Sequence, residues 1–115
     1  MELIGREELK AKLDRRDKFH LVMALGEWAY RAKHIPGSIY FTNTEEAMKA
    51  AKGLTLDEEI VVYCSNPGCM ASITAYTRLK GMGFRRVRRF AGGVEEWEAA
   101  GFPLEGEDVA ALRLT

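Results

Sequence analysis

Cys64 is the residue of this sequence with the clearest potential for chemistry, because of the segments that surround it. It follows a compact apolar run at residues 60–63 and precedes a turn-rich loop, after which helical spacing resumes. The backbone amides of such a loop and the partial positive charge of a helix N-terminus both stabilise a thiolate, which is the nucleophilic form of cysteine. The same groups make a pocket for an anion. This order of segments favours a reactive Cys64 over an inert, buried strand-end cysteine.

A second cysteine, Cys69, lies five positions further on in the same loop. One interpretation makes it a resolving thiol, which reacts with a modified Cys64 and leaves a Cys64–Cys69 disulfide. The other makes it a small loop side chain whose thiol points away. Spacing alone cannot direct two sulfurs at each other, and the two interpretations are nearly balanced, with the second slightly favoured because most polar loop residues do no chemistry. Two cysteines and two distant histidines also make a poor zinc site, so no metal is expected.

The elements that must position Cys64 alternate between strands and helices. The apolar runs predict strands at residues 19–25, 39–41, 60–63 and 86–90. The spacing predicts helices at residues 6–14, 27–33, from Thr44 onward, around 73–79 and at 94–100. This alternation predicts an α/β domain with a mostly parallel sheet and helices on both faces. Ligands bind such sheets beyond the carboxyl ends of the strands, which is where Cys64 stands.

Length and composition limit the functional classes. The 115 residues, 47% hydrophobic and 30% charged, predict one domain spanning residues 1–115. Seventeen basic and seventeen acidic side chains cancel, so nothing global attracts nucleic acid or a membrane surface. No signal peptide and no apolar run of roughly 18 residues are seen. A cytoplasmic location is expected, where thiols stay reduced and a structural disulfide is disfavoured.

Three segments together resemble the signatures of rhodanese domains, in that family's order and spacing. They are residues 34–39 (HIPGSI), Tyr63-Cys64 with Ser72 and Gly83-Phe84, and residues 90–104 (FAGGVEEWEAAGFPL). The resemblance covers roughly Leu3 to Leu104. It implies a rhodanese-like fold with a five-stranded parallel sheet, and it makes His34 a structural residue rather than a catalytic base.

The resemblance also implies a sulfurtransferase. In that reaction, Cys64 takes sulfane sulfur from thiosulfate or a persulfide donor and passes it to a thiol or to cyanide, with no cofactor. The loop amides would hold the outer sulfur. The residues of this substrate-binding or anion-binding loop are Ser65, Asn66, Pro67, Gly68, Cys69, Met70, Ala71 and Ser72.

The sequence departs from the family pattern at three places. One is Cys69 within the loop, which as a resolving thiol would attack a Cys64 persulfide, release sulfide and leave the Cys64–Cys69 disulfide. From Cys64 to Ser72 the loop is two residues longer than usual and contains no arginine. Met23, Ala24 and Leu25 stand where many members have Asp-Val-Arg, so support for the site is expected to be apolar. These departures leave three alternatives open: a catalytically weak binding or regulatory module, a Cys64–Cys69 redox protein, and a phosphatase-like or arsenate-handling enzyme. The last lacks the arginine that clamps phosphate.

The run of arginines at residues 85–89 has three interpretations: a solvated strand edge, a cation from Arg89 that replaces the missing loop arginine, or a docking face. The docking partner would be an acidic protein, a sulfur carrier or transfer RNA, although the overall charge disfavours nucleic acid. Cys69 and Arg89 are thus candidate accessory residues. The aromatic side chains Trp28, Tyr30 and Trp97 are expected to pack in the core or at its edge.

Overall fold

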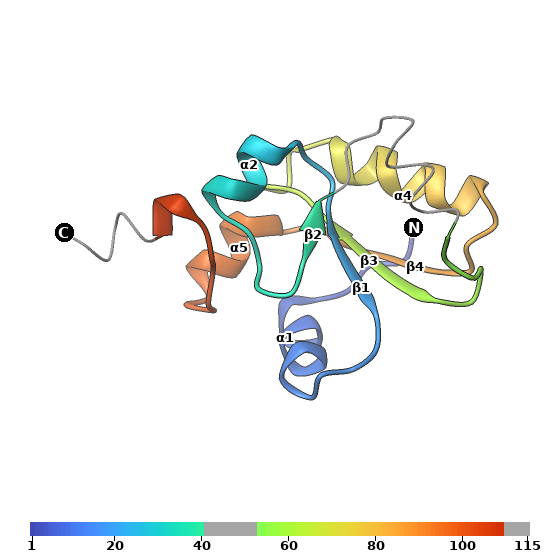
Figure 1. Ribbon diagram of the computed structural model, residues 1–115, viewed down its shortest axis with the longest axis horizontal. Coiled ribbons are helices and arrows are strands. Elements are labelled where there is room, and N and C mark those ends of the chain that lie inside the picture. The colour runs from blue at the N-terminus through green and yellow to red at the C-terminus, as the bar shows by residue number, and fades with distance from the viewer. Residues whose placement is uncertain (41–52, 110–115) are drawn as a thin grey trace.

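A computed structural model describes residues 1–40 and 53–109 of the chain (Figure 1). The helices and strands, in chain order, are α1 (Arg6–Asp14), β1 (His20–Met23), α2 (Glu27–Ala32), β2 (Ile39–Tyr40), β3 (Glu59–Tyr63), α4 (Ala71–Gly81), β4 (Arg86–Phe90) and α5 (Gly93–Ala99). Each lies at a position where the sequence predicts an element of that type. The helix predicted from Thr44 lies outside the described residues.

The strands form a parallel sheet in the order β2-β1-β3-β4. This confirms the predicted α/β architecture, although the described residues form four strands where five were expected. At the outer edge of β4, Leu3 makes a single parallel bridge with Arg89. The N-terminal segment therefore occupies the fifth position, but one bridge is too short to count as a strand.

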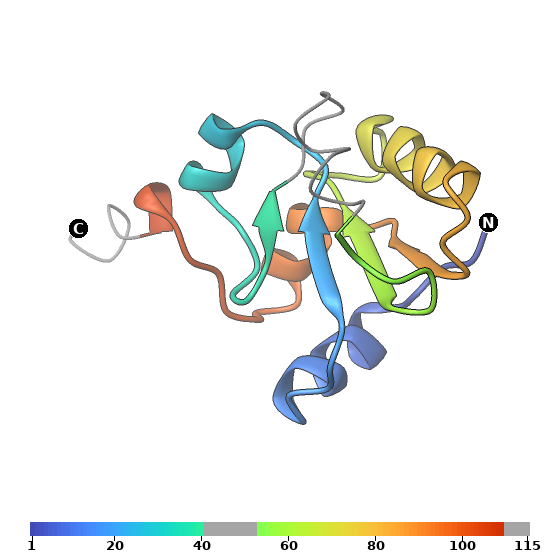
Figure 2. The ribbon, with the colours of Figure 1, turned by 45° about the vertical axis from the view of Figure 1, so that its right-hand side comes forward.

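Helices cover both faces of the sheet, and each face has its own core. On one face, α1 and α5 pack through Leu9, Val94 and Trp97 against alternate strand residues such as Val61. On the other face, Ala75, Tyr76 and Leu79 of α4 pack against the intervening strand residues. Figures 1 and 2 show α1 and α4 on opposite sides of the strands. Strands buried on both faces explain their nearly continuous runs of apolar residues.

The aromatic side chains of the helices differ from one another in burial. Trp97 is completely buried and Tyr30 packs against the same core, as predicted. Trp28 instead leaves 81% of its surface exposed, so the prediction that it packs is wrong. The helix α2 has only six residues, and its Ala29 and Tyr30 supply the contacts with the core.

The strand register brings the carboxyl ends of three strands together. Met23 pairs with Tyr63, and Tyr63 pairs with Phe90. The residue after Tyr63 is Cys64, so this cysteine lies at the sheet edge where ligands of open α/β folds bind. No helix in the described part of the chain is long and apolar enough to cross a membrane.

Candidate functional site

Cys64 lies at the end of β3 with only 1% of its surface exposed. The backbone on either side of the cysteine is tied to the start of α5. The carbonyl oxygen of Cys64 accepts a hydrogen bond from the Val94 amide at 3.0 Å, and the carbonyl of Ser65 accepts one from the Glu95 amide at 2.8 Å. These bonds fix the direction in which the chain leaves the strand, and hence the position of the cysteine.

The loop after Cys64 is built around a turn at Asn66. The side-chain oxygen of Asn66 accepts a hydrogen bond from the Gly68 amide at 3.0 Å. The backbone carbonyl oxygen of Asn66 accepts one from the Cys69 amide at 3.1 Å. Asparagine favours such turns because its side chain bonds to the backbone two residues on. The turn exposes Pro67 and Gly68 and directs the chain back toward β3.

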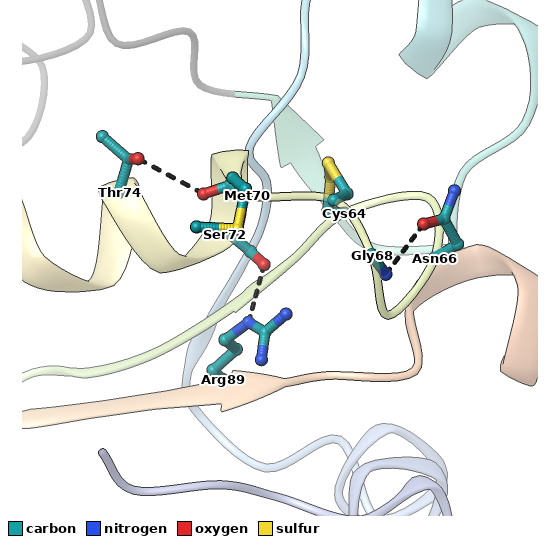
Figure 3. Close-up of a disulfide and its surroundings, with 8 residues drawn as sticks. Cys64, Asn66, Gly68, Met70, Ser72, Thr74 and Arg89 are labelled. Carbon is teal, nitrogen blue, oxygen red and sulfur yellow. Dashed lines mark hydrogen bonds between the residues drawn. A yellow bond between two sulfur atoms is a disulfide. The ribbon is translucent and has the colours of Figure 1, made fainter.

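The turn brings the two cysteines together, and their sulfurs form a disulfide with the Cα atoms 6.3 Å apart (Figure 3). The expectation of a Cys69 thiol that points away from Cys64 is therefore wrong. Cys69 is half-buried, whereas Cys64 is almost fully buried. In this disulfide form the amides of Gly68 and Cys69 bond within the loop, so they are not free to hold a sulfur atom as the sequence had suggested.

Helix α4 begins directly after the loop, and its first turn lies over a buried arginine. Ser72, which is completely buried, accepts a hydrogen bond from Nε of Arg89 at 2.8 Å (Figure 3). No side chain caps α4, and its first turn contains no acidic residue. The positive end of the helix is therefore not neutralised from within its own first turn.

Arg89 carries a charge that the described residues leave uncompensated. Only 7% of its surface is exposed, and its Nη2 atom is buried without a hydrogen-bond partner. Within residues 1–40 and 53–109 it forms no salt bridge, and Ser72 is its side-chain partner. Burial of an unpaired guanidinium costs several kcal/mol. An anion close to this residue would compensate that cost, so the arginine gives this end of the sheet a preference for negative charge.

The other arginines of the run play a different part from Arg89. Arg85 pairs with Asp57 at 2.6 Å and Arg86 approaches Glu59 at 3.7 Å, both near the amino ends of the strands. Arg88 pairs with Glu8 at 2.6 Å, and this hydrogen-bonded partner lowers the pKa of that carboxyl group. These three side chains line a shallow hollow with Glu2, Leu3 and Glu59. The run thus separates into paired surface charges and one buried cation.

Tyr63, the residue before Cys64, fixes the end of β3 through hydrogen bonds of its side chain. The sequence alone did not assign it this role. Its hydroxyl oxygen accepts a hydrogen bond from the Ile35 amide at 3.1 Å and shares another with Ser38 Oγ at 2.8 Å. Burial raises the pKa of Tyr63 to about 12. The hydroxyl of a tyrosine at the end of a buried strand needs hydrogen-bond partners, and from the sequence this requirement could have marked Tyr63 as a residue that ties β3 to another segment. The bonds link β3 to residues 34–39, one of the three segments that resemble rhodanese signatures.

The remaining residues around the site are structural. Nδ1 of His34 lies 2.7 Å from the carbonyl oxygen of Tyr30, and the two rings stack 3.8 Å apart, in keeping with the predicted structural role. Met23 and Ala24, at the end of β1, are buried and apolar. Within the described residues, no group of three or more His, Cys, Asp or Glu side chains is arranged to hold a metal ion.

The sequence model of the rhodanese-like domain matches residues 5–100. Among solved structures, a protein from Bacillus halodurans is 24% identical with a TM-score of 0.84, over 93% of this chain and 78% of that one. The rhodanese-like domain of an Anabaena protein is also 24% identical, with a TM-score of 0.82 over 96% of this chain and 83% of that one. A thiosulfate sulfurtransferase from Pseudomonas aeruginosa is 26% identical with a TM-score of 0.79, over 92% of this chain but 20% of that one.

One similar sequence carries a different description. An HTH-type transcriptional regulator from Mycobacterium tuberculosis is 38% identical over 76 residues. The match covers 66% of this chain and only 33% of the regulator. The similarity is thus to a part of that protein.

Proposed function

The chain belongs to the rhodanese-like domain family, and from that premise we propose that it is a sulfurtransferase whose nucleophile is Cys64. The single observation that carries the proposal is the position of this cysteine. It stands at the carboxyl end of a central parallel strand, before a loop that leads into the first turn of α4. A thiol in that place benefits from the helix N-terminus and from an arginine on the neighbouring strand.

The reaction begins with the reduced form of the site. The Cys64 thiolate attacks the outer sulfur of thiosulfate, the bond between the two donor sulfurs breaks, and sulfite leaves with the electron pair. Cys64 then carries the outer sulfur as a persulfide. A thiol or cyanide attacks that outer sulfur, and the Cys64 thiolate leaves unchanged. This is covalent catalysis, and it requires no oxidant.

Arg89 and α4 supply the charge that this cycle needs. Thiosulfate, sulfite and the persulfide are all anions, and the buried guanidinium beside Ser72 is a cation without a carboxylate partner in the described residues. We therefore assign to Arg89 the part that the missing loop arginine plays in the family pattern. Once the disulfide is reduced, the outer sulfur would be held by the remaining backbone amides of residues 65–72, since Pro67 has no N–H and the amides of Gly68 and Cys69 bond to Asn66.

The test is the intact mass of the reduced protein after brief exposure to thiosulfate, with Cys64→Ser and Cys69→Ser alongside. The expected result is the addition of one sulfur atom to Cys69→Ser, its removal by cyanide, and no addition to Cys64→Ser. If neither thiosulfate nor an alkyl persulfide adds sulfur to Cys69→Ser, the sulfurtransferase proposal is wrong.

A binding or regulatory module is the second candidate, and the similarity to a transcriptional regulator favours it. In such a module the rhodanese-like domain would recognise a ligand or partner without turning over a substrate. The same mass experiment separates the two, because a module of this kind takes up no sulfur. A phosphatase is less well supported, since no arginine lies in the loop to clamp a phosphate bidentately. Hydrolysis of a phosphate ester by the reduced protein would reverse that order.

A further inference from the structure

The chain contains two cysteines, and the fold brings both of them to one loop. Their Cα separation of 6.3 Å lies within the range of about 4.4–6.8 Å that a disulfide spans without backbone movement. The hydrogen bonds that form the turn at Asn66 involve no sulfur atom, so we expect the turn to keep Cys69 close to Cys64 when the disulfide is reduced. Cys69 is therefore positioned to react with a sulfur species that is bound covalently to Cys64.

We propose that Cys69 is a resolving thiol, which reduces the Cys64 persulfide and releases its outer sulfur as hydrogen sulfide. This inference rests on the proposed function, because it needs a persulfide on Cys64. It adds an activity to that function: the chain itself supplies the electrons that convert sulfane sulfur to sulfide. An external dithiol is then needed only as a reductant, to convert the disulfide back to two thiols.

The step balances in atoms and electrons. The thiolate of Cys69 attacks Sγ of Cys64, a bond forms between the two protein sulfurs, and the bond from Cys64 to the outer sulfur breaks. The outer sulfur leaves with the electron pair and takes the proton that the Cys69 thiol gave up. The two cysteine sulfurs are each oxidised by one electron, and the sulfane sulfur is reduced by two. The products are hydrogen sulfide and the Cys64–Cys69 disulfide.

A dithiol reductant is needed to convert the Cys64–Cys69 disulfide back to two thiols. The different burial of the two cysteines determines which sulfur the reductant attacks first. Cys64 is 1% exposed whereas Cys69 is half-buried, so a reductant reaches the sulfur of Cys69 more easily. Attack there forms a mixed disulfide on Cys69 and releases Cys64 as the leaving thiolate. The second thiol of the reductant then frees Cys69. The nucleophile is thus restored first and is ready for another donor molecule.

The loop explains why this intramolecular step outcompetes an acceptor from solution. Only four residues separate the two cysteines, and the Asn66 turn keeps them close. Groups held together in this way react at effective concentrations far above those of dissolved thiols. Cyanide or a thiol must also enter a site in which Cys64 is nearly buried. Sulfide release is therefore the expected fate of the persulfide when Cys69 is reduced.

The test uses reduced protein from which the reductant has been removed without oxygen, treated with one equivalent of thiosulfate or an alkyl persulfide. In the wild-type protein we expect one equivalent of sulfide and a mass lower by two hydrogen atoms. In Cys69→Ser we expect a stable gain of one sulfur atom and at least about tenfold less sulfide, because no second thiolate is present. Cys64→Ser should show neither change, and protein kept without donor should form no disulfide.

The outcomes separate this inference from the function on which it rests. If wild-type protein keeps the added sulfur as Cys69→Ser does, or forms the disulfide without an equal amount of sulfide, the resolving role is wrong while sulfur transfer stands. If Cys69→Ser takes up no sulfur from either donor, the sulfurtransferase proposal fails and the resolving role fails with it. Cys69→Ala, measured in parallel, shows that the result does not depend on the serine hydroxyl.

Discussion

The backbone of Gly93 lies directly against the carbonyl oxygen of Cys64, so closely that a β-carbon on residue 93 would overlap that oxygen. Gly93 adopts a φ of +64°, in the left-handed region that favours glycine. The next two amides, of Val94 and Glu95, donate hydrogen bonds to the carbonyl oxygens of Cys64 and Ser65. The start of α5 and the start of the loop are therefore one structural unit.

Gly93→Ala should damage both stability and the site. The left-handed backbone alone costs an alanine about 1 kcal/mol. Gly101→Ala is the matched control, since Gly101 has a φ of +77° but no atom within 4 Å of its would-be β-carbon. We expect urea unfolding to show that Gly93→Ala loses about 1–3 kcal/mol more of the free energy of unfolding than Gly101→Ala, because its β-carbon displaces the backbone at Cys64. Equal losses of stability in the two variants would mean that the close contact between Gly93 and Cys64 does not contribute to stability.

Arg89→Met should slow sulfur loading from thiosulfate without destabilising the fold. Loss of the cation should reduce the loading rate at least about tenfold, since one charge-assisted contact is worth about 1.5–3 kcal/mol. Removal of a buried, unpaired charge leaves stability unchanged or raises it. Arg88→Met, which removes a cation paired with Glu8, is the control and should load at the wild-type rate. The measurements are loading rate against thiosulfate concentration and urea unfolding. Wild-type loading in Arg89→Met would contradict the assigned role.

Tyr63→Phe should lower stability at neutral pH and flatten its dependence on alkaline pH. The variant leaves the Ile35 amide without its acceptor, which costs about 1–3 kcal/mol. In the folded protein burial raises the pKa of Tyr63 from its ordinary value to about 12. Its contribution is thus fully present below pH about 10 and is lost as the pH rises toward about 12.

The corresponding measurement is urea unfolding between neutral and strongly alkaline pH. From a shift of this size the wild-type protein should lose about 2–3 kcal/mol across that window because of Tyr63. The phenylalanine variant lacks this part of the loss. If the two proteins lose stability in parallel, the Tyr63 hydroxyl does not titrate as its burial requires.

Asn66→Ala should weaken the Cys64–Cys69 disulfide, because the turn would lose the acceptor that its side chain provides to Gly68. Asn66→Asp keeps an acceptor oxygen in that place and is the matched control. We expect the equilibrium constant for disulfide formation, measured in glutathione buffers, to fall several-fold for the alanine variant and less for the aspartate variant. An unchanged constant for Asn66→Ala would mean that the backbone bond at Cys69 orders the loop by itself.

Much of the fold follows from local pattern. The apolar run at residues 60–63 and the alternation of strands with helices predict β3 and its parallel neighbours, because a strand buried on both faces needs apolar residues throughout. Trp28 shows where such reasoning fails. On a helix of six residues, apolar neighbours in sequence do not determine which face is turned to the core, and Trp28 lies on the exposed face.

The candidate site could be predicted only in part. The place of Cys64 follows from strand, loop and helix in succession. The direction of the Cys69 sulfur depends on the turn at Asn66, which spacing alone does not reveal. Arg89 differs from the neighbouring arginines for two reasons. Side chains alternate between the two faces of β4, and on its face Arg89 meets Ser72 of α4. Contacts between elements far apart in sequence leave no local signal.

The N-terminal segment hydrogen-bonds to both sides of one residue of β4. The Arg89 amide donates to the carbonyl oxygen of Glu2 at 2.9 Å, and the Ile4 amide donates to the carbonyl oxygen of Arg89 at 3.0 Å. These contacts occupy backbone groups that an edge strand otherwise offers to a second chain, which is a common route to aggregation. Fraying of residues 2–4 would therefore open β4 to strand addition and loosen the backbone that carries the buried guanidinium. Hydrogen exchange at the Arg89 amide reports both events at once.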